Sequence, residues 1–211
     1  MENSANRAEL CGRFVTLPSL SHENHGQKFY HFYMEVDRLS GASDVLRIIA
    51  PEPILYQTEL TDGDMLFVRG QVRSYNEHTE SGRRLRIFVY ADRLECRRSE
   101  ALNSIALTGT VCRPPVYRRT PLGREICDLM LAVPRGFRRT DYIPCIAWGR
   151  TARAASGLGT GDLMELLGRL QSRDYVKTTP EGAEQRTAYE VSILSAQFPE
   201  KPDAKNFIEL M

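Results

Sequence analysis

Gly161-Asp-Leu-Met-Glu-Leu-Leu-Gly-Arg-Leu170 repeats, 98 residues later, the pattern of Gly63-Asp-Met-Leu-Phe-Val-Arg-Gly-Gln-Val72. Both stretches carry an aspartate after the first glycine, apolar residues in between, and a second glycine seven positions after the first. Glycine is favoured where a strand bends sharply or where neighbouring backbone comes close, as in a small barrel. A shared pattern of this length predicts two copies of one structural unit.

A second set of glycines supports the repeat. Gly12 and Gly26 lie 14 residues apart, as do Gly109 and Gly123, which follow 97 residues further along the chain. With 211 residues, the chain is long enough for two domains of about 100 residues each. We therefore expect an N-terminal unit at residues 1–98, a C-terminal unit at residues 103–198 and a short tail at residues 199–211.

The second unit alternates apolar with small or polar residues, as short strands do. Such alternation occurs in five segments, and a short alanine-rich segment at Gly149–Ser156 is expected to be a helix that glycines end. Five strands with one helix between the third and the fourth are the layout of an OB-fold barrel, and the first unit follows the same order. The expected fold class is all-β, with two tandem OB folds that are each a β-barrel with one short helix.

Charge is distributed unevenly along the chain, although the formal net charge is only +1. Residues 1–102 hold 13 Lys and Arg against 15 Asp and Glu, whereas residues 103–198 hold 13 against 9. The second unit is therefore the expected partner of a polyanion.

No pattern typical of a metal, cofactor or catalytic site is present in the sequence. The five cysteines are widely spaced and contain no Cys-x-x-Cys pair, which argues against a zinc site and against a disulfide framework. His22 and His25 lack further ligands nearby, and the carboxylates that a nuclease would need, Asp141, Asp162 and Asp174, are scattered. We expect no metal, no cofactor and no enzymatic activity.

The polar N-terminus and the lack of a long apolar run argue against a signal peptide and a membrane span. Together with widely spaced cysteines, these features favour a cytoplasmic protein with reduced thiols.

The expected third strand, at 141–148, is apolar on both faces, although a strand of a small barrel needs only one apolar face. One face carries Ile143, Cys145 and Ala147, and the opposite face carries two large rings, Tyr142 and Trp148. These rings could stack on unpaired bases, or they could pack beneath a loop or in a subunit contact.

The expected fourth strand, at 162–176, presents Arg169, Arg173 and Tyr175 on its outward face. Arginines beside a ring suit a phosphate backbone whose bases stack next to it, although a solvated face with a single tyrosine has the same pattern. Phe137 lies among further arginines in the loop before the third strand.

At these residues the second unit resembles the bacterial single-stranded DNA-binding protein family. The resemblance covers Asn103–Phe198. It rests on a combination of short motifs: Leu107-Thr-Gly109-x-Val111, Pro115-x-x-Arg118-x-Thr120-x-x-Gly123, Leu131-Ala-Val133, Tyr142 to Trp148-Gly149-Arg150, Gly161-Asp162, and Gly168-Arg-Leu-Gln-x-Arg173-x-Tyr175.

The resemblance implies an OB barrel that binds single-stranded DNA without sequence preference. It further implies that Phe137, Tyr142, Trp148 and Tyr175 stack on bases. The arginines around these rings are the candidate phosphate-binding residues: Arg113, Arg118, Arg119, Arg138, Arg139, Arg150, Arg169 and Arg173.

The biological role that the resemblance implies is strand protection during DNA replication, recombination and repair, in the cytoplasm at the nucleoid. A typical member of the family has one barrel per chain and works as an assembly of four, so a chain with two units is expected to form a homodimer. The family usually ends in a long acidic tail that recruits replication or repair proteins, and the segment Pro199–Met211 lacks that pattern.

Two alternatives remain open at the sequence level: a primosome-type or RNA-directed OB protein, and an oligomeric assembly module whose rings lie in an interface.

The first unit lacks the equivalent rings, because Val45 and Pro51 stand at the positions of Tyr142 and Trp148, and Tyr75 corresponds only approximately to Tyr175. Its own rings and arginines could bind DNA by another route or build a subunit contact: Phe29, Tyr30, Phe32, Tyr33, Arg84, Arg86, Phe88 and Tyr90.

Overall fold

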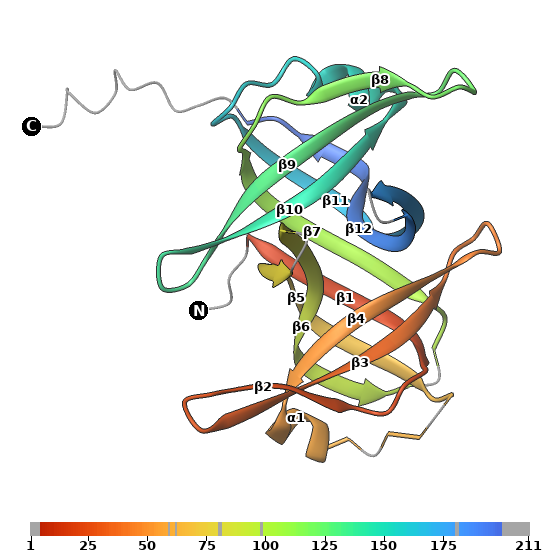
Figure 1. The fold of residues 1–211 in the computed structure, drawn as a ribbon, viewed down its shortest axis with the longest axis vertical. Coiled ribbons are helices and arrows are strands. Elements are labelled where there is room, and N and C mark those ends of the chain that lie inside the picture. Colours follow the sequence, from red (N-terminus) through yellow and green to blue (C-terminus); the bar gives the residue numbers. More distant parts are fainter. Residues whose placement is uncertain are drawn as a thin grey trace, which may run out of the picture.

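Two small β-barrels, one above the other, make up the structure (Figure 1). The structure, a computed structural model, describes residues 5–58, 60–61, 63–79, 82–97, 99–179 and 182–199. All but the first residue of the tail expected at residues 199–211 lies outside the described residues.

The first barrel is formed by six strands and one short helix. In chain order these are β1 (Asn6–Phe14), β2 (Ser19–Asn24), β3 (Gln27–Asp37), β4 (Ser43–Pro51), α1 (Glu52–Tyr56), β5 (Met65–Thr79) and β6 (Gly82–Cys96). The second barrel repeats this order with β7 (Leu102–Val111), β8 (Val116–Arg119), β9 (Glu125–Arg135), β10 (Arg139–Trp148), α2 (Gly149–Ala155), β11 (Leu163–Thr179) and β12 (Gly182–Gln197).

Each barrel closes through the same set of strand pairs. In the first barrel β1 pairs with β3, β3 with β4, β4 with β6 in parallel, β6 with β5, and β5 with β1; β7, β9, β10, β12 and β11 repeat these pairs in the second. This arrangement confirms the expected fold class. The short strands β2 and β8 were not predicted, and consequently Arg118 and Arg119, which the sequence places in a loop, lie in β8.

The repeated glycines Gly70 and Gly168 lie where the backbones of neighbouring strands nearly touch. A Cβ atom at either position would collide with a carbonyl oxygen of the adjacent strand, that of Tyr90 or of Ser192. The pairing register shifts next to both glycines, as in a β-bulge, which bends each barrel at the same place. The close backbone contact explains why the glycine pattern repeats in both units.

The two barrels are joined by antiparallel pairing of their first strands, β1 and β7. Ala8 pairs with Ile105, its own counterpart in the repeat, while Asn6 pairs with Leu107 and Leu10 with Asn103. This register is unchanged when the two units are exchanged, so a pseudo-two-fold axis passes through the pair of Ala8 and Ile105. The helices α1 and α2 accordingly lie at opposite ends of the molecule (Figure 1).

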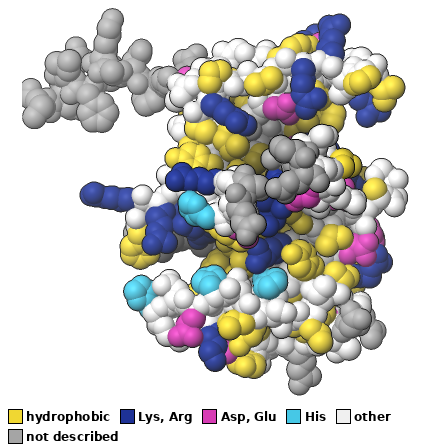
Figure 2. Space-filling view, viewed as in Figure 1, with side chains coloured by type: hydrophobic (Ala, Val, Ile, Leu, Met, Phe, Trp, Pro, Cys, Tyr) yellow, Lys and Arg dark blue, Asp and Glu magenta, His cyan; other side chains and the backbone are white. Residues whose placement is uncertain are grey.

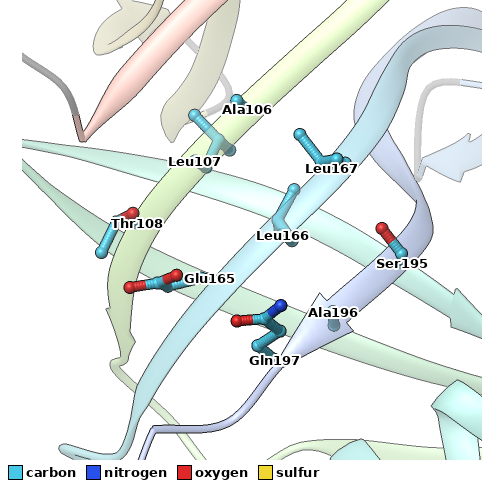
Figure 3. A pocket seen from close by; sticks show the side chains of 9 residues that line it. All are labelled: Ala106, Leu107, Thr108, Glu165, Leu166, Leu167, Ser195, Ala196 and Gln197. Atoms are coloured by element: carbon cyan, nitrogen blue, oxygen red, sulfur yellow. The ribbon is translucent and has the colours of Figure 1, made fainter.

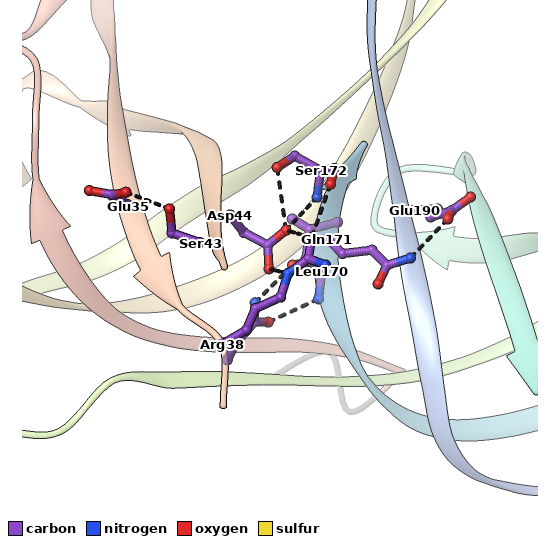
Figure 4. Close-up of polar contacts among 9 residues, drawn as sticks. Glu35, Arg38, Ser43, Asp44, Leu170, Gln171, Ser172 and Glu190 are labelled. Atoms are coloured by element: carbon purple, nitrogen blue, oxygen red, sulfur yellow. Dashed lines mark hydrogen bonds and ion pairs between the residues drawn. The ribbon is translucent and has the colours of Figure 1, made fainter. Parts of the chain in front are cut away.

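Two buried carboxylates reinforce the junction, one from each barrel. Asp44 of β4 accepts a hydrogen bond of 2.7 Å from the backbone N–H of Ser172 in the other barrel (Figure 4). Asp141, 97 residues later, accepts one of 2.8 Å from the backbone N–H of Ser74 in the first barrel. Both aspartates are almost completely buried. The sequence pattern did not predict this role for either aspartate.

Arginines neutralise both carboxylates. Arg38 donates to Asp44 and also to the backbone carbonyl of Ser172, so it spans the junction (Figure 4). Arg135 donates to Asp141 at 3.4 Å, and Arg73 of the first barrel lies 3.7 Å from the second carboxylate oxygen. The pseudo-two-fold axis therefore relates Asp44 to Asp141, and it relates Arg38 to Arg135.

Replacing Asp44 with Ala should lower the free energy of unfolding by about 2–4 kcal/mol, because it leaves the Ser172 N–H and the Arg38 guanidinium without their hydrogen-bond acceptor. Urea denaturation followed by circular dichroism measures the loss. Asp92→Ala is the matched control, since Asp92 pairs with Arg69 at the surface and such pairs contribute about 1 kcal/mol or less. Equal effects of the two substitutions would contradict the role given to Asp44.

Candidate nucleic-acid interface

The outward side chains of β11, β12, β10 and β9 form one continuous face on the second barrel. Arg169 of β11 lies opposite Ser192 of β12, Ser192 lies opposite Ile146 of β10, and Ile146 lies opposite Asp128 of β9. Residues that lie opposite one another on paired strands point to the same side of a sheet. The candidate residues predicted on the third and fourth strands therefore share this outer face.

The alternation expected along β10 is present except at Ile146, which lies on the outward side but is buried. Ile143, Cys145 and Ala147 are buried in the barrel, whereas the rings of Tyr142 and Trp148 are 46% and 37% exposed on the outer face. Neither ring is sealed beneath a loop within the described chain. Two of the four candidate rings are thus open to a ligand on one strand.

Trp148 is held in place at the end of β10. Its indole Nε1 donates a hydrogen bond of 3.0 Å to the hydroxyl of Ser192, which is itself buried. Among the described residues, neither Trp148 nor Tyr142 contacts another aromatic ring. The indole is therefore oriented from one edge while part of its surface remains exposed.

The other two candidate rings lie apart from these. Phe137 is fully exposed at the turn between β9 and β10, where Phe137 and Arg138 both have positive φ angles. Because a strand rises about 3.3 Å per residue, Tyr142 lies about 20 Å from Trp148, and Phe137 lies before the start of β10, on the side of Tyr142 away from Trp148. Tyr175 is half-buried on β11 beneath the guanidinium of Arg173, at 5.7 Å. The four rings are therefore spread over two strands and a turn and do not form one cluster.

The candidate arginines fall into two groups. Arg169 is half-buried, and its Nε has no hydrogen-bond partner among the described residues. Five others are exposed, and the described part of the chain offers them no ion pair: Arg113, Arg138, Arg139, Arg150 and Arg173. These arginines are available to an anion.

Arg118 and Arg119 are already paired. Arg118 donates to Asp128 at 2.7 Å, and this contact raises the pKa of Arg118. Arg119 lies 3.5 Å from Glu125. The sequence reasoning did not consider these acids, although the outward position of Asp128 follows from its alternation with the buried residues of β9. The face is therefore less cationic than the arginine count suggests.

Tyr117 is an exposed ring that the sequence reasoning missed. It is 38% exposed on β8, and its hydroxyl donates a hydrogen bond of 2.7 Å to Glu125. This bond lowers the pKa of the Glu125 carboxyl. The unexpected strand β8 is the reason for the omission, because the segment was assigned to a loop.

The equivalent face of the first barrel has a different character. Its rings contact one another: His22 stacks on Phe29 at 4.7 Å, and Tyr75 meets Phe88 edge to face at 5.8 Å. The pairing register also places Glu77, and not Tyr75, at the position of Tyr175, because Glu77 lies opposite Arg84 as Tyr175 lies opposite Arg186. The first barrel therefore does not reproduce the ring pattern of the second.

A separate hollow of about 350 Å³ lies on the second barrel between β7, β11 and β12 (Figure 3). It is lined mainly by apolar and small side chains, among them Leu107, Leu166 and Ala196. None of the candidate residues lines it, so it is not part of the interface described above.

Within the described residues, no group of three or more His, Cys, Asp or Glu side chains could hold a metal ion. A membrane-spanning helix is likewise not found in that part of the chain.

The fold and the exposed face together define a tandem OB-fold protein. Wild-type single-stranded DNA-binding protein from Thermus aquaticus has the same architecture, with a TM-score of 0.77 over 94% of this chain and 95% of that one, at 23% sequence identity. Residues 102–199, which include the second barrel, match the single-strand binding protein family.

Proteins similar to this chain in sequence are also named single-stranded DNA-binding proteins. A single-stranded DNA-binding protein of Staphylococcus aureus is 34% identical over 113 residues, which cover 49% of this chain and 65% of the relative. The single-stranded DNA-binding protein of Thermus thermophilus is 25% identical over 97% of this chain and 88% of its own length. The first relative thus matches about half of this chain, whereas the second extends across both barrels.

The cysteines provide a test of the barrel cores. Cys11, Cys127 and Cys145 are buried, and burial raises the pKa of the Cys127 and Cys145 thiols, whereas Cys96 is exposed and Cys112 partly so. Titration with a thiol reagent should label two cysteines in the native protein and all five in denaturant. Mass spectrometry of the labelled peptides identifies the sites, and native labelling of Cys145 would contradict the packing described for β10.

Proposed function

We propose that this protein binds single-stranded DNA without sequence preference, and that it acts by binding and not by catalysis. The observation that carries the proposal is the pair of rings on β10, Tyr142 and Trp148, which are exposed on one face without another ring against them. The match of residues 102–199 to the single-strand binding protein family and the names of the relatives support the choice of ligand. The proposed role is protection of the strand during replication, recombination and repair.

Stacking supplies the larger part of the proposed affinity. A base on an aromatic side chain contributes about 1–3 kcal/mol, and every base has a flat face, so stacking discriminates little between sequences. Trp148 lies on one side of Tyr142 along β10, and Phe137 and Tyr175 lie toward the other side. A strand lying along β10 would thus meet rings at intervals and not at one site.

The exposed arginines provide the electrostatic part. Each phosphate that they neutralise adds about 0.7 to the salt dependence of binding to a single strand, so the five exposed candidates would together give a slope of about 3.5. Arg118 and Arg119 are expected to contribute less to phosphate binding, because Asp128 and Glu125 already compensate their charge.

Tyr142→Ala should weaken binding of oligo-dT by about 5- to 100-fold, because one stacking contact is lost. Trp148 is the single tryptophan of the chain, so its fluorescence reports binding directly and should be quenched by oligo-dT in the unsubstituted protein. A fluorescence titration at fixed salt concentration measures both effects.

Tyr56→Ala is the matched control, since Tyr56 is an 80% exposed tyrosine on α1, at the far end of the first barrel. It should leave the affinity unchanged. Equal losses for both tyrosines, or an unquenched Trp148, would contradict the proposal and favour rings that serve an oligomer interface. Competition with oligo-rU distinguishes the nucleic acids, and a clear preference for rU would identify an RNA-directed protein.

We also propose that two chains associate, which would bring four barrels together. The pairing of β1 with β7 already joins two barrels within one chain, and exposed apolar side chains on β11 and β12 offer further surface: Leu167, Val176 and Leu194. Light scattering should give twice the chain mass of 24.0 kDa. A mass of one chain at micromolar concentration would exclude the dimer.

A further inference from the structure

A cleft of about 330 Å³ lies between the two barrels, where strand β6 of the first faces strand β12 of the second. Residues of both strands line it, together with Pro144 of β10 and Tyr175 of β11. Basic side chains gather at this waist of the molecule (Figure 2). Neither barrel alone contains the cleft, because each contributes only one of its walls.

The pseudo-two-fold axis brings two equivalent arginines into the cleft. Arg84 lies opposite Glu77 on β5, and Arg186 lies opposite Tyr175 on β11, at matching positions of the two hairpins. Both arginines line the cleft, and so do Arg83 and Arg86. The concentration of positive charge is therefore a consequence of the way in which β1 and β7 pair.

The charge of these arginines is only partly compensated. Arg86 is paired with Glu77 and Arg186 with Glu184. Arg83 and Arg84 form no ion pair with the described residues, and the buried Nε of Arg186 has no hydrogen-bond partner there. Among the described residues that line the cleft, Glu190 is the single acid, and it accepts a hydrogen bond from Gln171.

The cleft opens onto the ring-bearing face of the second barrel. Pro144 lies between Tyr142 and Ile146 on the outer side of β10, and Tyr175 ends the outward row of β11. A strand stacked on Tyr142 can therefore continue from the arginines of that face into the cleft, where it meets further cationic side chains. Fixed guanidinium groups suit the phosphodiester groups of such a strand, since they bind phosphate oxygens through paired N–H donors.

We propose that this cleft binds the backbone of single-stranded DNA where the strand passes from the second barrel to the first. The inference rests on the proposed function and adds a crossing point to it. Arg83 and Arg84 supply the uncompensated charge, and Tyr175 marks the side on which the strand enters.

The test compares oligo-dT of two lengths on the double variant Arg83→Gln, Arg84→Gln. An oligomer of about 8 nucleotides fits on one barrel, and one of about 30 nucleotides spans two, since an OB fold covers about 4–16 nucleotides. Loss of two phosphate contacts should weaken binding of the long oligomer about tenfold at moderate salt and lower its salt slope by about 1.4. Binding of the short oligomer, followed by quenching of Trp148, should not change.

Arg93→Gln, Arg97→Gln is the matched control, because it removes two arginines from the far end of the same strand, where both pair with Glu95. It should leave the slope for the long oligomer unchanged, and thermal unfolding checks that both double variants are folded. An unchanged slope for the cleft variant, or equal losses for both oligomers, would overturn the proposed crossing. A wild-type chain in which neither oligomer quenches Trp148 would overturn the proposed function itself, and the crossing with it.

Discussion

The antiparallel pairing of β1 with β7 is the interaction on which the rest of the molecule depends. It converts two barrels into one sheet system and fixes a pseudo-two-fold axis at the pair of Ala8 and Ile105. Asp44 and Asp141 then lock the barrels by accepting backbone hydrogen bonds from the opposite unit. Because a buried carboxylate without partners is strongly destabilising, this arrangement permits little sliding between the barrels. The relative position of the two outer faces, and of the cleft between them, follows from that restriction.

Most of the fold could be predicted from the sequence, because its main determinants are local. The glycines at 70 and 168 lie at tight backbone contacts, and such contacts tolerate no other residue in either unit. The inward direction of Ile143, Cys145 and Ala147 on β10 likewise follows from burial of apolar side chains in the barrel. The strand β8 could not be predicted, since its four residues are all exposed and carry no apolar alternation. The pairing of β1 with β7 was also beyond sequence reasoning, because it depends on tertiary register.

The candidate interface was likewise predictable only in part from the sequence. Exposure of Tyr142 and Trp148 agrees with the sequence pattern, whereas Ile146, on the same face, is buried. The charge of the face was overestimated, since arginines were counted without the acids that meet them across neighbouring strands. Asp128 pairs with Arg118 from ten positions away in the chain, and only the strand register reveals that contact. Sequence patterns predict which residues point outward, whereas the structure decides which of them remain unpaired.

Joining both barrels in one chain has a consequence for how the two halves can diverge. In an assembly of identical subunits, any substitution appears in every copy at once. Here the partner of each barrel is supplied at high effective concentration by the same polypeptide, so one half can change its surface while the other retains its own. The self-contacting rings of the first barrel and the open rings of the second are the outcome expected of such specialisation. A chain that contains two copies of one module can in this way present different surfaces at its two ends.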